Sequence, residues 1–205
     1  MISLTSLGQQ FYAQIGQTIS TFEYKNSAGQ ELDNLNSKSY LNMRLGYRDV
    51  LNNENSLFLS VGLIYSGYGA IGSDRVLDNY YEWDVSYLGF EMGLSFRFLR
   101  LRDFSFFLEG TAASEFLIQG TQTINNQVFN LVGEEEFNSY NFFLRGGLMV
   151  SYPISRTANI SASYNYGITK QLNKGNPDDG EQLNFNAHQV SLGFIINLPG
   201  CNCSY

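Results

Sequence analysis

The sequence predicts an all-β chain that closes into an eight-stranded antiparallel up-and-down transmembrane β-barrel. Three observations lead to this prediction: apolar and small polar residues alternate with a period of two, charge is scarce while aromatic residues are abundant, and short connectors alternate with long ones. A period of two is typical of strands, because successive side chains point to opposite faces of a sheet.

The alternation also indicates which face meets lipid. Residues 88–98 carry Leu, Phe and Met at even positions and Gly, Glu, Ser and Arg at odd positions, and residues 160–168 alternate in a similar way. A soluble barrel has an apolar or ligand-shaped interior and a polar exterior. Small polar residues on one face and large apolar residues on the other instead favour a polar lumen and a lipid-facing wall.

The composition fits a chain whose largest surface meets hydrocarbon. Charged residues make up 15% of the 205-residue chain, whereas soluble domains contain about 25%. Aromatic residues contribute another 15%. No apolar run approaches the ~20 residues that a spanning helix needs, so the sequence predicts a strand barrel rather than a helical membrane protein.

Eight segments carry the strand signal, and an even number suits closure of an antiparallel barrel. In order they are residues 10–24, 39–48, 56–68, 82–99, 104–119, 140–152, 158–171 and 183–198. The expected lipid-facing residues of the first three are Phe11, Ala13, Ile15 and Ile19; Leu41, Met43, Leu45 and Tyr47; and Leu57, Leu59, Val61, Leu63 and Tyr65. In 140–152 and 183–198 they are Phe142, Leu144, Gly146, Leu148, Val150 and Tyr152, and then Val190, Leu192, Phe194, Ile196 and Leu198.

The connectors differ in length in a regular order. Short links lie near residues 49–55, 100–103 and 153–157, and long ones at 25–38, 69–81, 120–139 and 172–182. Outer membrane barrels have short periplasmic turns and long extracellular loops. We therefore expect the bacterial outer membrane as the location, with both termini in the periplasm.

The expected domain organisation is a single barrel over residues 9–199. Residues 1–8 are interpreted as a signal-peptide remnant or a disordered N-terminus, and residues 200–205 as a periplasmic C-terminal tail. Cys201 and Cys203 lie in that tail. A frayed tail is one interpretation, and a redox or intermolecular thiol pair is the alternative.

Acidic residues gather in the long connectors and the strand ends beside them, which hold 13 of the 19 acids but five of the 12 bases. An acidic rim repels phosphate backbones, so we expect no nucleic-acid partner. The same regions are candidate contact sites for a partner, with a divalent cation or a carbohydrate platform around residues 80–83 as alternatives. The candidate contact residues are Trp83, Glu134, Glu135, Glu136, Asp178 and Asp179.

Charged residues of the polar face are expected inside the barrel, where an eight-stranded wall leaves room only for side chains. Buried charges must pair, because an unpaired ion in a low-dielectric interior is very costly. The hypothesis is an ion-pair network that plugs the lumen, and a gate or proton path is the alternative. The candidate network is Arg44, Glu91, Arg97, Glu109 and Arg145.

A lipid-modifying hydrolase would need a nucleophile within reach of a base. His188 is the only histidine, and Ser191 has the opposite parity on the same segment. The two side chains should therefore point to opposite faces. We expect no catalytic residue, cofactor or metal site.

Aromatic residues near the predicted strand ends are typical of the girdles at membrane interfaces. The expected girdle comprises Tyr12, Tyr47, Tyr65, Tyr68, Tyr80, Tyr81, Trp83, Tyr87, Tyr140 and Tyr152.

Two segments resemble a known group of proteins. Residues 87–98, YLGFEMGLSFRF, are similar to the fourth strand of small outer membrane barrels common in Bacteroidetes, and residues 188–198, HQVSLGFIINL, resemble their closing strand. The PorT-like family and the OmpA/OmpX-type eight-stranded barrels are the nearest descriptions. One departure is that Pro199–Tyr205 follow the last strand, whereas such proteins usually stop on an aromatic strand residue.

The resemblance implies a structural, adhesive or machine-accessory role, sometimes in protein secretion, rather than chemistry. We expect a non-enzymatic accessory subunit whose partners are outer membrane lipid or lipopolysaccharide and other outer membrane or periplasmic proteins. The alternatives are a surface adhesin that uses the acidic loops, a lipid-modifying enzyme and a water-filled pore.

Overall fold

The computed structural model describes residues 9–25, 35–74, 79–132, 140–170 and 182–198. Nine strands occur in these ranges: β1 (Gln10–Lys25), β2 (Leu35–Val50), β3 (Leu57–Asp74), β4 (Asn79–Leu101), β5 (Phe104–Ile124), β6 (Gln127–Asn130), β7 (Tyr140–Pro153), β8 (Ala158–Lys170) and β9 (Gln182–Asn197). No helix in the described ranges is long and apolar enough to cross a membrane.

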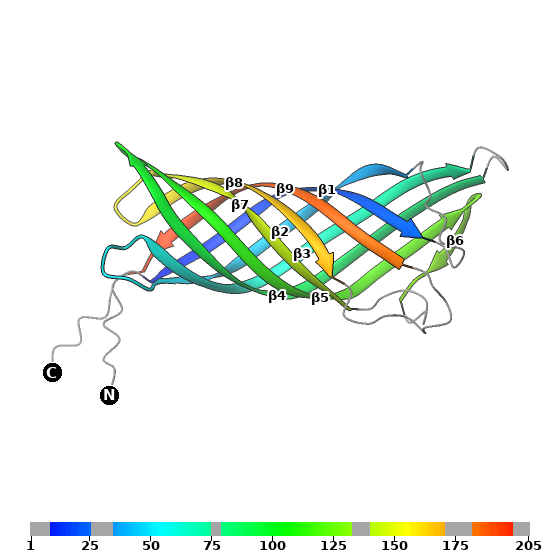
Figure 1. Ribbon diagram of the computed structural model, residues 1–205, viewed down its shortest axis with the longest axis horizontal. Coiled ribbons are helices and arrows are strands. Elements are labelled where there is room, and N and C mark those ends of the chain that lie inside the picture. The colour runs from blue at the N-terminus through cyan, green and yellow to red at the C-terminus, as the bar shows by residue number, and fades with distance from the viewer. Residues whose placement is uncertain (1–8, 26–34, 75–78, 133–139, 171–181, 199–205) are drawn as a thin grey trace, which may run out of the picture.

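Eight of these strands form one closed antiparallel barrel (Figure 1). The sheet order runs β4-β3-β2-β1-β9-β8-β7-β5, and β5 also pairs with β4, which closes the ring. The first and last strands pair along their whole length, from Gln10 opposite Asn197 to Lys25 opposite Gln182. The predicted eight-stranded antiparallel barrel is therefore confirmed.

The barrel has two unlike ends. At one end, called here the short-turn end, three short turns join β2 to β3, β4 to β5 and β7 to β8, and β1 begins and β9 ends there (Figure 1). The other end is called the long-connector end. β4 and β5 contain 23 and 21 residues, more than the 9–11 that a membrane-spanning strand needs. Their surplus extends the wall beyond the membrane at the long-connector end.

The strand boundaries at that end differ from those expected. Residues 120–124, assigned from the sequence to a long connector, continue β5, and β6 pairs with them as a hairpin. Asn125 and Asn126 make its turn with φ angles of 47° and 69°, the left-handed values that a two-residue hairpin turn needs. Beyond the membrane a strand has no need of an apolar face, so the sequence there lacks the alternation that marks the other strands.

The outer face of the wall carries an apolar belt. Along β4 it contains Leu88, Phe90, Met92, Leu94, Phe96 and Phe98, which are between 46% and 65% exposed. On β9 the belt runs from Val190 to Ile196. Large apolar side chains exposed in a continuous ring are what a lipid-facing barrel wall presents.

Candidate functional site

The lumen is the candidate site, because the inner face gathers most of the buried charges. Two apolar clusters also fill it. The cluster nearer the short-turn end consists of Tyr12, Phe58, Phe107, Met149 and Ile195. The cluster nearer the long-connector end consists of Phe22, Ile64, Tyr68, Ala70, Val85, Tyr87, Ala113, Leu131, Phe143 and Ala187. Each cluster includes a tyrosine whose hydroxyl bonds to a buried ion pair.

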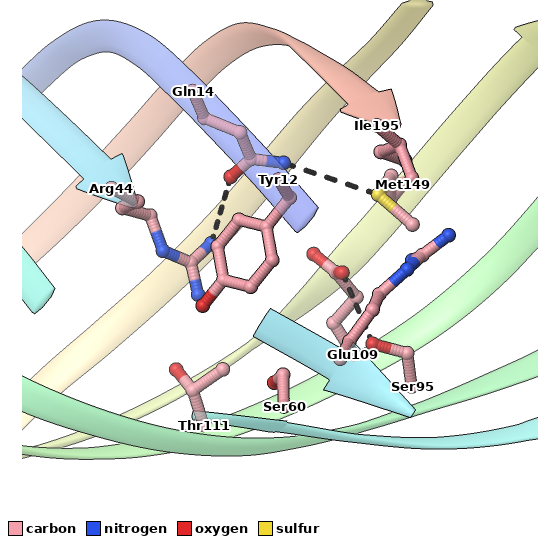
Figure 2. Close-up of a pocket in the computed structure, with 10 residues that line it drawn as sticks. Tyr12, Gln14, Arg44, Ser60, Ser95, Glu109, Thr111, Met149 and Ile195 are labelled. Carbon is pink, nitrogen blue, oxygen red and sulfur yellow. Dashed lines mark hydrogen bonds between the residues drawn. The ribbon is translucent and has the colours of Figure 1, made fainter. Parts of the chain in front are cut away.

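The first ion pair joins Arg44 of β2 to Glu91 of β4. The Arg44 Nε donates to both Glu91 carboxylate oxygens at 3.0 Å, and Nη2 lies 2.9 Å from Oε2. The hydroxyl of Tyr12 donates to Glu91 Oε1 at 2.9 Å. Arg44 Nη1 also donates to the amide oxygen of Gln14 at 3.3 Å, and Figure 2 shows these two side chains beside Tyr12. A carboxylate held by two side chains from separate strands is fixed in place.

The second ion pair repeats this chemistry with other strands. Arg145 of β7 pairs with Glu115 of β5, and both side chains are at most 1% exposed. The hydroxyl of Tyr68 on β3 donates to Glu115 Oε2 at 2.8 Å and accepts from Arg145 Nη2 at 2.9 Å. The Phe143 ring stacks on Tyr68 at 5.0 Å and lies 4.5 Å from the Arg145 guanidinium carbon. We call each set of three side chains a Tyr–Glu–Arg triad.

Two further charges lie near the short-turn end. Glu109 accepts a hydrogen bond from Ser95 at 3.3 Å, and both line the small cavity drawn in Figure 2. The Arg48 guanidinium carbon lies 4.8 Å from the Phe58 ring and 5.3 Å from the Phe107 ring. The cavity between these groups has a volume of about 20 Å³, which is room for about one water molecule.

The structure brings some of the predicted network together and leaves one member apart. Arg44, Glu91, Glu109 and Arg145 are buried in the lumen. Arg97 lies instead at the short-turn end, partly exposed, where it donates to the carbonyl of Glu54 at 3.4 Å. Among the described residues, it makes no ion pair with the predicted network.

Sequence reasoning missed Glu115 and Arg48. Both could have been found from strand parity, since Glu115 shares a face with Glu109 on β5 and Arg48 shares a face with Arg44 on β2. Their partners could not be found in this way, because parity assigns a face and not a depth in the barrel.

Three tyrosines assigned from the sequence to the membrane interface lie in the lumen instead. Tyr12, Tyr68 and Tyr87 are 6%, 0% and 0% exposed. The assignment was wrong because an aromatic ring with a hydroxyl fits the lipid interface and a buried polar network equally well. For Tyr12 and Tyr68, the buried glutamates explain the inward position.

The predicted contact residues separate into two groups. Trp83 is half-buried, packs against the apolar cluster nearer the long-connector end and stacks on Tyr81 at 5.9 Å. The others, together with Cys201 and Cys203, lie outside the described residues: Glu134, Glu135, Glu136, Asp178 and Asp179. The described ranges contain no group of three or more residues able to hold a metal ion.

A charged cluster lies on the wall near the long-connector end, beyond the apolar belt of β4. Lys38 pairs with Glu82 and also donates to Asp84 at 2.8 Å. Tyr80 donates to Glu82 at 2.9 Å. The hydrogen bond from Lys38 makes the largest contribution to lowering the pKa of the Glu82 carboxyl below its ordinary value, and the bond from Tyr80 adds to it.

His188 and Ser191 lie on opposite faces of β9. His188 is exposed on the outer wall, where the Tyr164 hydroxyl is 2.8 Å from its Nδ1. Ser191 is 3% exposed in the lumen and donates to Asn42 at 2.9 Å. The barrel wall therefore separates the two side chains, as their parity predicts.

The closed antiparallel wall, apolar belt and polar lumen define the class of bacterial outer membrane β-barrels. Neisserial surface protein A has this fold, with a TM-score of 0.51 and 13% identity over 92% of this chain and 97% of that one. The outer membrane protease OmpT from Escherichia coli has a TM-score of 0.50 and 7% identity, over 97% of this chain and 99% of that one. No protein-family model matches the chain, and no curated protein is similar to it in sequence.

Proposed function

We propose that this protein is a non-enzymatic structural or accessory subunit of an envelope protein complex in the bacterial outer membrane. The observation that carries the proposal is the filled lumen. Two Tyr–Glu–Arg triads and two apolar clusters occupy it, and the cavity beside the triad nearer the short-turn end is about 20 Å³. A filled lumen does not favour solute transport. We therefore assign the function to the outer wall and the connectors, which are available to bind other proteins.

The proposed orientation places the long connectors outside the cell and both ends of the chain in the periplasm. It is supported by the connector lengths, because outer membrane barrels have short periplasmic turns and long extracellular loops. In this orientation the wall contacts outer membrane lipid or lipopolysaccharide. Protein partners can reach the long connectors from outside the cell and the short-turn end from the periplasm. We expect no nucleic-acid partner.

The finer proposal is a role in protein secretion within a PorT-like, Bacteroidetes-type system. Its support is the resemblance of residues 87–98 and 188–198 to strands of that group. Catalysis is not part of the proposal, since His188 and Ser191 lie on opposite faces of the wall.

The test is extraction of the tagged chain from outer membranes in gentle detergent, followed by native mass determination and identification of co-purified proteins. A complex of fixed composition is the expected result. A single species with the mass of one chain plus detergent contradicts the accessory role and favours a free-standing surface barrel.

A second candidate is a surface adhesin, and the β5–β6 hairpin favours it. This hairpin lies at the long-connector end (Figure 1), and Val128 and Phe129 on it are 67% and 46% exposed. Val132, just after it, is 47% exposed. Exposed apolar side chains at a tip are available for binding a partner. Loss of cell attachment in the double variant Val128→Ser, Phe129→Ser would support this role.

A further inference from the structure

The short-turn end contains a second, larger hollow that the closed lumen does not explain. Its volume is about 200 Å³, and three arginines line it: Arg48, Arg97 and Arg100. Asp103 is the one carboxylate among its lining residues. Within the described ranges, no ion pair joins any of the three arginines to a carboxylate. Positive charge is therefore in excess in this hollow.

A β-bulge in β4 places two of the arginines on one side of the sheet. Arg97 lies opposite Phe107, whereas Leu99 lies opposite Phe106, so Phe98 is an extra residue in the ladder. Residues three apart on a regular strand face opposite sides, but the extra residue brings Arg100, opposite Ser105, to the same face as Arg97. Bulges commonly re-aim a side chain in this way.

Arg48 forms the inner wall of the hollow. It is 5% exposed, and its guanidinium is held between the rings of Phe58 and Phe107. Its Nε donates to the side-chain oxygen of Gln10, which also lines the hollow. This is a positioned cation at the base of an open site, not a side chain that moves freely in solvent.

We propose that this hollow binds a phosphate group from the aqueous side of the short-turn end. Guanidinium groups have planar donor pairs that match two phosphate oxygens, and charge-assisted bonds of this kind are stronger than neutral ones. Asn159 and Asn197 on the rim add amide donors. The site lies at the mouth of the lumen, shares Arg48 with the small cavity inside it, and does not depend on the accessory role. Free phosphate and a lipid headgroup share this chemistry.

The experiment titrates inorganic phosphate into the full chain, refolded in dodecyl maltoside, which contains no phosphate, with calorimetry as the readout. Saturable binding at one site is expected. Arg97→Gln and Arg100→Gln should each weaken binding by about tenfold, the factor that corresponds to one lost charge-assisted bond. Asp103→Asn should tighten binding, because it removes a negative charge from the lining.

Arg156→Gln is the matched control. Arg156 is exposed in the β7–β8 turn at the same end, but it does not line the hollow. Its loss changes the net charge by the same amount, so phosphate affinity should stay the same. Circular dichroism and heat-dependent gel migration check that each variant has folded.

The absence of saturable binding by the folded wild-type chain overturns the proposal. A loss in Arg156→Gln equal to that in Arg97→Gln overturns it as well, because it indicates general charge attraction. Competition by a short-chain phosphatidic acid assigns the site to lipid headgroups. Phosphate binding without that competition assigns it to free phosphate.

Discussion

The two buried glutamates Glu91 and Glu115 are each held by one arginine and one tyrosine. The tyrosine hydroxyl satisfies a carboxylate oxygen that the guanidinium alone leaves short of donors. This matters because the cost of removing ions from water is offset only when the remaining hydrogen-bonding sites are filled. Each triad therefore fixes the geometry of its side chains, and the loss of one member should strongly lower the free energy of unfolding.

Glu115→Gln should destabilise the barrel by about 3–5 kcal/mol, because it leaves the fully buried Arg145 without a counter-charge. Urea unfolding of the chain in detergent, followed by tryptophan fluorescence, measures this loss. The comparison is Glu82→Gln, which removes one of the two carboxylate partners of Lys38 on the outer wall. This pair is partly exposed to water, and pairs at the surface contribute about 0–1 kcal/mol. Equal losses in the two variants contradict the assignment of Glu115 to a buried triad.

Replacing both ions of the triad distinguishes a lost pair from lost packing. The double variant Glu115→Leu, Arg145→Met should recover most of the stability lost in Glu115→Gln, since buried ion pairs are often replaced by apolar residues with little cost. If the double variant is at least as unstable as the single one, Glu115 and Arg145 are not coupled to each other.

The inner face also contains glycines where two strands approach closely. A Cβ added to Gly147 on the inner face would lie 2.1 Å from the carbonyl oxygen of Tyr164, whereas one added to Gly110, which is exposed on the outer face of β5, would meet nothing within 4 Å. We expect Gly147→Ala to cost about 1–3 kcal/mol, as overpacking does. Gly110→Ala should change stability by at most about 0.5 kcal/mol. The same unfolding assay tests both, and equal effects would contradict this explanation.

The position and partners of each inward-facing side chain could be predicted from the sequence only in part. Alternation assigned Arg44, Glu91 and Arg145 to the polar face, which is where the structure places them. Alternation carries no information on depth, so Arg97 was grouped with them although it lies at the mouth. Tyr12 and Tyr68 were misplaced because their role depends on a glutamate from a distant strand.

At the scale of elements, the strands that cross the apolar belt were predictable to within a few residues. Lipid on one side and a polar lumen on the other impose a strict period of two, which a sequence reveals directly. The ends beyond the belt were not predictable, since water on both sides removes that constraint. β6 was missed for this reason: its four residues, Gln127–Asn130, are all exposed.

The turn between β5 and β6 requires left-handed backbone at Asn125 and Asn126. Asn126→Gly should leave the hairpin paired, whereas Asn126→Val should destabilise it by about 1–2 kcal/mol, because a side chain with a branched Cβ fits this conformation poorly. Hydrogen exchange of the amides in residues 121–124 and 127–130 measures the opening. Unchanged protection in the valine variant would contradict the turn geometry.

At the scale of the whole molecule, the buried charges of the lumen balance. Three arginines, Arg44, Arg48 and Arg145, and three glutamates, Glu91, Glu109 and Glu115, are buried there, and two of each form ion pairs. Together with the two apolar clusters, they occupy much of the lumen, and a cavity of about 20 Å³ lies among the side chains nearer the short-turn end. These side chains make the lumen a packed interior and not an open channel in the part of the chain that the structure describes.

The purified chain should show near-zero conductance in planar bilayers. The physical reason is that an ion entering the lumen must displace paired side chains and leave its hydration shell. An open porin inserted under the same conditions is the positive control. Reproducible conductance steps that depend on protein concentration would contradict a filled lumen and revive the pore alternative.

The triads also bear on how the barrel is assembled. Each triad links strands that are not neighbours in the sheet: Tyr12 on β1 and Arg44 on β2 reach Glu91 on β4, and Tyr68 on β3 reaches Glu115 on β5. While β1 and β9 are still apart, these ions face water and remain hydrated. Pairing of β1 with β9 then expels that water, so ring closure is where the cost of dehydration falls. A chain that lacks one triad partner would accumulate as an inserted but open sheet, with its first and last strands exposed to other chains.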